Sequence, residues 1–153
     1  SLGTTFSIYL PLHDARMTHT DAPARMKSMQ RGTETILLVD DEQPLLKLTR
    51  RLLERLGYTV IEADSPNAAL SAIQADTNNI HLLMTDISMP EMTGQELCLQ
   101  VREYNPNIRC LFMSGYMADS AAYADSLHVN GCFIQKPFDM SLLAMRVREA
   151  LRS

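Results

Sequence analysis

The sequence predicts an α/β domain in which a parallel sheet is covered by helices on both faces. Short, nearly continuous apolar runs recur from residue 34 onward, and amphipathic helical patterns fill the gaps between them. Apolar runs without alternation are typical of strands buried on both faces of a parallel sheet. Because crossovers between parallel strands are right-handed, a series of such units leaves few topologies.

The strand-like runs are rich in Ile, Leu, Val and Met. They lie at 35–39, 58–63, 80–85, 108–113 and 131–134. Flavodoxin-like folds join five parallel strands in the order 2-1-3-4-5, and this order fits the pattern best. Their ligands bind beyond the C-terminal ends of the strands, near the switch point between the first and third strands.

The first helix is predicted over residues 42–56, with Pro44 in its first turn and Gly57 as its stop. Leucines at regular spacing form one stripe that is predicted to face the sheet. The stripe consists of Leu45, Leu48, Leu52, Leu53 and Leu56.

Three further helices have recognisable beginnings, and a weaker helical pattern covers about 119–127. Ser65 and Pro66 open the second helix, Thr93 and Glu96 have the spacing of a capping box, and Asp139 caps the last helix. The residues predicted to face inward are Ala69, Leu70 and Ile73, then Leu97, Val101 and Tyr104, then Leu143, Val147, Ala150 and Leu151.

Charged residues follow three of the predicted strands. Asp40 and Asp41 follow the first, Asp86 follows the third, and Lys136 follows the fifth. Carboxylates are hard ligands of the kind that Mg²⁺ prefers, and a lysine can offset part of their charge and contact a phosphate oxygen. A carboxylate such as Asp86 can also act as a nucleophile and form an acyl phosphate.

Each of these features is weak alone, since a strand-terminal Asp is common and the Asp40-Asp41 pair could simply cap the next helix. Their combination in order resembles the response-regulator receiver domain, the phospho-acceptor of two-component signalling, over residues 34–153. The matching segments are Val39-Asp40-Asp41-Glu42, Asp86-Ile87-Ser88-Met89-Pro90-Glu91-Met92-Thr93-Gly94, Ser114-Gly115 and Lys136-Pro137-Phe138.

The resemblance implies that Asp86 is the phosphorylation site and that the cofactor is Mg²⁺ or Mn²⁺. Asp41, Asp86 and the backbone carbonyl of Ser88 would bind the metal directly, and Asp40 would act through water. Ser114 and Lys136 would contact the phosphoryl group, and Ser114 and Phe133 would form the conformational switch.

The N-terminus resembles a different family. Residues 3–11, Gly-Thr-Thr-Phe-Ser-Ile-Tyr-Leu-Pro, are similar to the end of a histidine-kinase ATP-binding domain, although Ser1 stands where a glycine is expected. Residues 1–11 would then be the remnant of such a domain, and the parent a hybrid sensor histidine kinase. The alternative is a linker strand. Residues 12–33 are polar, with Pro23 and Gly32, and predict a flexible linker.

These features predict a receiver that takes a phosphoryl group from a phosphohistidine, in cis or in trans, and hydrolyses it slowly. It would not be a turnover enzyme, and a histidine phosphotransfer protein is a candidate downstream partner. A stand-alone or contact-only regulatory module is one alternative. A phosphatase of the haloacid-dehalogenase type is a weaker one, because it needs a second Asp where Ser88 stands.

Composition narrows the class of protein further. The net charge of −4 argues against a nucleic-acid partner, and no apolar run approaches the ~18 residues of a membrane span. We expect a cytoplasmic domain without direct membrane contact, whose parent could still be membrane-anchored.

Cys98, Cys110 and Cys132 are expected to be small buried packing residues, with a disulfide or metal role as the lesser alternative.

Overall fold

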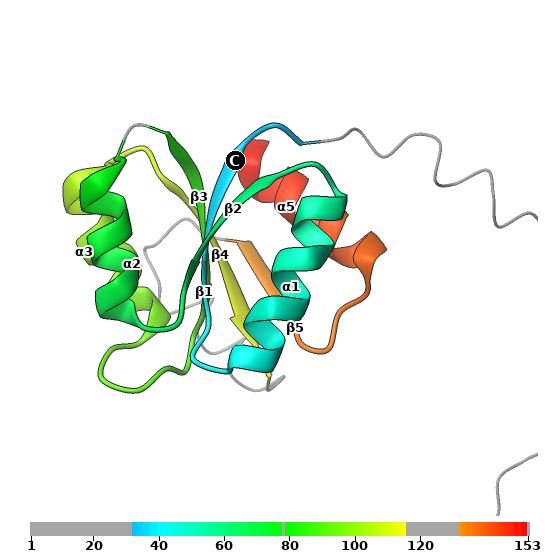
Figure 1. The fold of residues 1–153 in the computed structure, drawn as a ribbon, viewed down its shortest axis with the longest axis horizontal. Helices are drawn as coiled ribbons and strands as arrows, with labels where there is room; N and C mark the ends of the chain where they lie inside the picture. Colours follow the sequence, from blue (N-terminus) through cyan, green and yellow to red (C-terminus); the bar gives the residue numbers. More distant parts are fainter. Residues whose placement is uncertain (1–31, 78, 116–131, 153) are drawn as a thin grey trace, which may run out of the picture.

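The structure, a computed structural model, describes residues 32–77, 79–115 and 132–152. Within these ranges, five strands form one sheet in which all neighbours are parallel. The strands are β1 (Thr35–Val39), β2 (Thr59–Ala63), β3 (Ile80–Asp86), β4 (Arg109–Ser114) and β5 (Cys132–Gln135). Their order is β2-β1-β3-β4-β5, which confirms the predicted flavodoxin-like topology (Figure 1).

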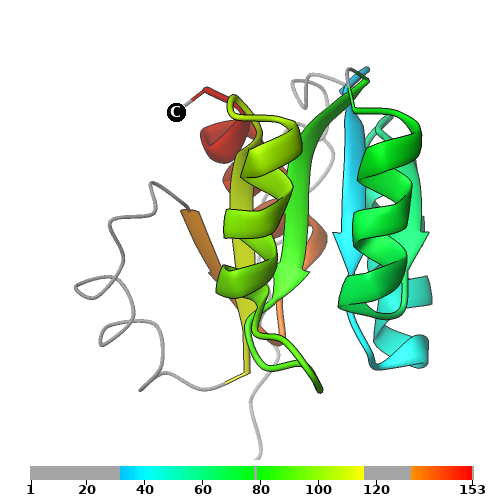
Figure 2. The same cartoon turned by 90° about the vertical axis from the view of Figure 1, so that its left-hand side faces the viewer.

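The described helices cover the sheet in two pairs. They are α1 (Gln43–Arg55), α2 (Pro66–Ala75), α3 (Gly94–Tyr104) and α5 (Met140–Arg152). Helices α2 and α3 lie on one face, and α1 and α5 lie on the other (Figures 1 and 2). The predicted helix over about 119–127 and the predictions for residues 1–31 lie outside the described residues. No helix in the described part of the chain has the length and apolar character needed to cross a membrane.

The two faces of the sheet carry separate apolar layers. Along β1, Leu37 and Val39 join the layer under α2 and α3, whereas Ile36 and Leu38 join the layer under α1 and α5. None of these four side chains is exposed, as expected for a strand covered on both faces. The packed layers therefore hold the C-terminal strand ends, where the predicted site lies, in fixed positions.

Capping residues at the N-termini of α2, α3 and α5 confirm the predicted beginnings of these helices. Ser65 caps α2 by accepting a hydrogen bond from the Ala68 amide at 3.3 Å, and Thr93 and Glu96 complete a capping box at α3. Asp139 accepts from the Leu142 amide at 2.8 Å, which satisfies one of the free N–H groups at the start of α5.

Two residues that were predicted to face inward are exposed. Leu48 is 55% exposed, because α1 instead buries the line formed by Leu46, Thr49 and Leu53. The predicted stripe shares Leu53 with this buried line but includes Leu48 in place of Thr49. The spacing of apolar residues could not identify Thr49 as a core residue, because Thr49 is polar. Tyr104 at the end of α3 is 44% exposed, and its hydroxyl accepts a hydrogen bond from the Gln74 amide group at 2.9 Å.

The cysteine prediction is only partly correct. Cys98 and Cys110 are buried, as expected, but the structure joins them in a disulfide between α3 and β4. The sequence offered no signal for this pairing, because the contact arises from the packing of α3 on the sheet. Cys132, the first residue of β5, is partly buried.

The cap of α2 generates a stability prediction. Ser65→Ala should lower the free energy of unfolding by about 1 kcal/mol, because the Ala68 amide loses its acceptor. Ser71→Ala is the matched control, since its exposed hydroxyl only donates to the Asn67 carbonyl within the same helix. Urea unfolding of both variants measures the difference. Equal losses would show that the cap contributes nothing specific.

Candidate functional site

Three carboxylates meet at the C-terminal ends of two neighbouring strands. Asp40 and Asp41 directly follow β1, and Asp86 is the last residue of β3. Because β1 and β3 are paired in parallel, their ends lie side by side, and one carboxylate oxygen from each residue lies within 4.8 Å of the others. The structure therefore brings together the three acidic residues that the sequence singled out.

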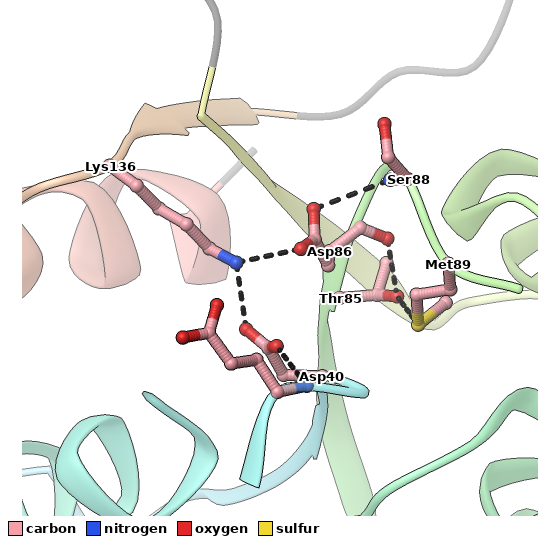
Figure 3. Close-up of polar contacts among 7 residues, drawn as sticks. Asp40, Thr85, Asp86, Ser88, Met89 and Lys136 are labelled. Carbon is pink, nitrogen blue, oxygen red and sulfur yellow. Dashed lines mark hydrogen bonds and ion pairs between the residues drawn. The ribbon is translucent and has the colours of Figure 1, made fainter. Parts of the chain in front are cut away.

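Lys136, which directly follows β5, supplies the opposing charge. Its ammonium nitrogen lies 2.8 Å from Asp40 Oδ2 and 2.7 Å from Asp86 Oδ2, so it bridges the two carboxylates (Figure 3). Asp40 is only 1% exposed and the lysine side chain only 13%. Burial would lower the pKa of Lys136, but the hydrogen bonds and charges of Asp40 and Asp86 outweigh it and raise the pKa. The lysine is therefore charged at neutral pH.

Backbone amides hold the other oxygen of each bridged carboxylate. The Glu42 amide donates to Asp40 Oδ1 at 2.9 Å, and the Ser88 amide donates to Asp86 Oδ1 at 3.3 Å. Each carboxylate thus has one oxygen on Lys136 and one on the main chain, as Figure 3 shows. These contacts fix the direction of both side chains, whereas Asp41 is exposed to solvent.

The loop after Asp86 returns the chain to the same strand end. The Ile87 amide donates to the Met113 carbonyl of β4, and the Gly94 amide donates to the Ile87 carbonyl, both at 3.0 Å. A Cβ atom on Gly94 would overlap the carbonyl oxygen of Asp86 and lie 3.0 Å from the Thr85 methyl carbon. Only a glycine at the start of α3 therefore leaves the Asp86 backbone where it is.

The predicted switch residues lie on the two adjoining strands. Ser114 ends β4, is nearly fully buried, and accepts a hydrogen bond from the Lys136 amide through its backbone carbonyl at 2.7 Å. Phe133 in β5 is partly buried, and its ring centroid lies 5.3 Å from that of Phe112 in β4. This backbone hydrogen bond connects the C-terminal end of β4 directly to Lys136, the lysine that forms the ion pair with Asp86.

The structure also reveals supporting residues that the sequence did not identify. Thr85 donates from its hydroxyl to the Asp86 carbonyl at 3.0 Å, beside Met89 (Figure 3). Glu91 has a φ of 69°, and its carboxylate accepts from the Asn67 side chain at 3.2 Å. A Glu in the left-handed region leaves no sequence signal, since Gly and Asn are the residues usual there.

Three carboxylates and one ammonium leave an excess of negative charge at this strand end. Hard oxygen donors at this spacing suit a divalent cation such as Mg²⁺, whose charge would relieve the repulsion between Asp40, Asp41 and Asp86. A carboxylate in such a site, beside a cation and a lysine, is also placed to react with phosphorus.

The close approach of Gly94 to Asp86 predicts a specific loss of metal binding. Gly94→Ala should weaken Mg²⁺ binding at least tenfold, because the new methyl group displaces the Asp86 carbonyl and misplaces a ligand. Gly115→Ala is the matched control, since a Cβ there meets no described atom within 4 Å. Titration calorimetry measures the Mg²⁺ affinity of both variants. Equal affinities would rule out the positioning role of Gly94.

Removal of the bridging lysine should destabilise the domain when no divalent cation is present. Lys136→Met leaves the buried Asp40 without its partner, and we expect the free energy of unfolding to fall by about 3 kcal/mol at pH 7. Because the folded pKa of Lys136 is raised, the wild type retains this stabilisation until strongly alkaline pH. Millimolar Mg²⁺ should restore part of the loss.

Arg146→Met is the control for this experiment, because Arg146 forms a largely exposed ion pair with Glu149 and should matter little. Urea unfolding with and without Mg²⁺ compares the two variants. A loss in Lys136→Met no larger than that in Arg146→Met would contradict the balance of charges described above.

Comparison with known proteins agrees with this geometry. The family model described as the response regulator receiver domain matches residues 36–148. The sensor kinase CckA of Brucella abortus is 35% identical over 97% of the chain, which spans 16% of that kinase. The response regulator receiver protein CpdR of the same organism is 29% identical over 76% of the chain and 95% of its own length.

The fold of the chain is also similar to that of a solved receiver domain. The crystal structure of the receiver domain from the hybrid histidine kinase CckA superimposes with a TM-score of 0.66 and 32% identity, over 76% of this chain and 98% of that one. The match of the family model, the five-stranded parallel sheet and the acidic cluster at its strand ends all lead to one assignment. The chain belongs to the family of response regulator receiver domains, the receiving modules of two-component signalling.

Proposed function

We propose that Asp86 accepts a phosphoryl group from a phosphohistidine in a Mg²⁺-dependent reaction. The observation that carries this proposal is the constellation at Asp86, whose carboxylate is held by Lys136 at 2.7 Å and lies beside two further carboxylates. The side chain is partly exposed at the edge of the sheet, so a donor can reach it. A buried structural ion pair would not need the third, exposed carboxylate of Asp41.

The reaction follows from the groups present. A carboxylate oxygen of Asp86 attacks phosphorus, and an O–P bond forms as the N–P bond to the donor imidazole breaks. The electron pair of the N–P bond stays on nitrogen, and the donor leaves as neutral imidazole because its other ring nitrogen already carries a proton. Little covalent chemistry is required of the protein, which mainly positions the reactants and neutralises charge. Lys136 suits this task, since its raised pKa keeps it charged beside the negative phosphoryl oxygens.

Asp41, Asp86 and the backbone carbonyl of Ser88 are the proposed direct metal ligands, with Asp40 acting through water. Mg²⁺ bound there supplies charge neutralisation at the phosphoryl oxygens. Support comes from exposure: the Asp40 side chain is only 1% exposed, whereas that of Asp86 is 16% exposed and Asp41 is exposed to solvent.

Phosphorylation of Asp86 is proposed to shift the domain between two conformations. Ser114 would move toward the phosphoryl group and Phe133 would follow, which changes the surface around β4 and β5. The proposal is supported by the position of Ser114 at the end of β4 and by the contact of Phe133 with Phe112. Such a change is a population shift between states of a bistable element.

We infer further that the parent protein is a hybrid sensor histidine kinase. The similarity to the sensor kinase CckA extends over 97% of the chain and so includes residues before the receiver, whereas the similarity to CpdR covers 76%. Residues 1–11 would then be the end of a kinase ATP-binding domain, and residues 12–33 a linker. The phosphohistidine donor would lie in the same protein or in a partner kinase, and a histidine phosphotransfer protein would be a downstream acceptor.

The acceptor role predicts a covalent product that can be weighed. Incubation of the chain with acetyl phosphate and Mg²⁺ should add one phosphoryl group, because the carboxylate of Asp86 is the nucleophile. Asp86→Asn should add none, whereas Asp76→Asn, which changes an exposed Asp at the end of α2, should behave as the wild type. Intact-mass spectrometry with and without Mg²⁺ measures the gain. A wild type that gains nothing, even from a phosphorylated histidine kinase, would reduce the chain to a contact-only module.

A further inference from the structure

The edge of the sheet opposite the acidic site carries a second cluster of polar contacts, formed by Gly32, Glu34, Tyr58 and Arg148. We call it the junction cluster, because it lies where the chain enters β1. Arg148 Nη1 on α5 lies 2.9 Å from Glu34 Oε1, and its guanidinium carbon lies 5.5 Å from the centroid of the Tyr58 ring. The ion pair is about three-quarters buried, so its geometry is better defined than that of a surface pair.

Glu34 is held from several directions at once. Its second carboxylate oxygen accepts from the Thr33 amide at 2.8 Å, and its backbone carbonyl accepts from the amide of Thr59, the first residue of β2, at 3.1 Å. Partial burial would raise the pKa of Glu34, but the hydrogen bond from Thr33 and the charge of Arg148 outweigh it and lower the pKa. The carboxylate is therefore ionised at neutral pH and bound to α5.

Gly32 brings the main chain into the same cluster. Its amide donates to the Leu56 carbonyl at 2.9 Å, and a Cβ atom there would collide with the ring of Tyr58. The chain thus runs closely over the ring that also receives the guanidinium of Arg148. The direction in which residues 32–34 join the domain depends on where Tyr58 and Arg148 stand.

Helix α5 connects this cluster to the acidic site. It begins at Met140, four residues after Lys136, and carries Arg148 about two turns further along. Figure 1 shows that it runs from the C-terminal edge of the sheet back to the edge where β1 begins. Its inner-face residues Leu143 and Val147 have no exposed surface, so the part of the helix between its first turn and Arg148 is packed tightly against the sheet.

We infer that α5 couples the state of the acidic site to the junction that joins the receiver to the preceding chain. When Lys136 exchanges its carboxylate partners, Arg148 on α5 changes its contacts with Glu34 and Tyr58. The backbone hydrogen bonds of residues 32–35 are then weakened or strengthened. The physiological trigger rests on the proposed function, since phosphorylation of Asp86 is the event that would engage Lys136.

Backbone hydrogen exchange, read by mass spectrometry on the 153-residue chain, tests the coupling without any phosphoryl group. Lys136→Met should raise exchange in residues 32–35 at least threefold, while a peptide from β3 reports any global loosening. Arg148→Gln should raise it similarly. The double variant should add nothing further, because both substitutions release the same contact. Arg146→Gln, on the same helix, should leave the junction unchanged.

A second perturbation protects the test against a poorly folded Lys136→Met. Asp86→Asn removes the charge of one partner of Lys136. It should change the exchange of residues 32–35 when Arg148 is present but not in a chain that also carries Arg148→Gln. If neither variant alters the junction while Arg148→Gln does, the cluster is only a local anchor and the inference is overturned. A parallel sample treated with acetyl phosphate and Mg²⁺ is weighed first, so that failure to phosphorylate counts against the proposed function alone.

Discussion

The repulsion among Asp40, Asp41 and Asp86 is the constraint on which the rest of the structure depends. Parallel pairing of β1 and β3 forces their C-terminal ends together, and the carboxylates lie within 4.8 Å of one another. Lys136 relieves part of this repulsion and backbone amides of Glu42 and Ser88 relieve more. The remaining negative charge suits the site to a divalent cation, whose charge would offset it.

The packing around the site prevents this repulsion from being relieved by movement. Strands covered on both faces hold their ends in place, and Gly94 at the start of α3 lies directly against the Asp86 backbone. Glu91, in the left-handed region, closes the intervening loop. The Lys136 amide is hydrogen-bonded to the Ser114 carbonyl, and the chain enters α5 four residues after Lys136. One charged residue therefore belongs to the acidic site and to the segment that leads from β5 into α5.

Much of this arrangement could be predicted from the sequence, because burial on both faces leaves continuous apolar runs and the charged residues stand at their ends. The strand order, the helix caps and the meeting of Asp40, Asp41, Asp86 and Lys136 were predicted correctly. Contacts that depend on tertiary packing were not. The buried line of α1 runs through the polar Thr49, and the Cys98–Cys110 disulfide forms only because α3 lies over β4. The ion pair between Glu34 and Arg148 joins residues that are 114 positions apart in the sequence.

The central claim, that Asp86 is the acceptor, is tested most directly by locating the phosphoryl group within the chain. Borohydride reduces an acyl phosphate to an alcohol and so converts a phosphorylated aspartate to homoserine. After treatment with acetyl phosphate and Mg²⁺, peptide mass mapping should find homoserine at position 86 and leave Asp40 and Asp41 unchanged. Homoserine at position 40 or 41, or an unmodified residue 86 in a chain that has gained a phosphoryl group, would contradict the account.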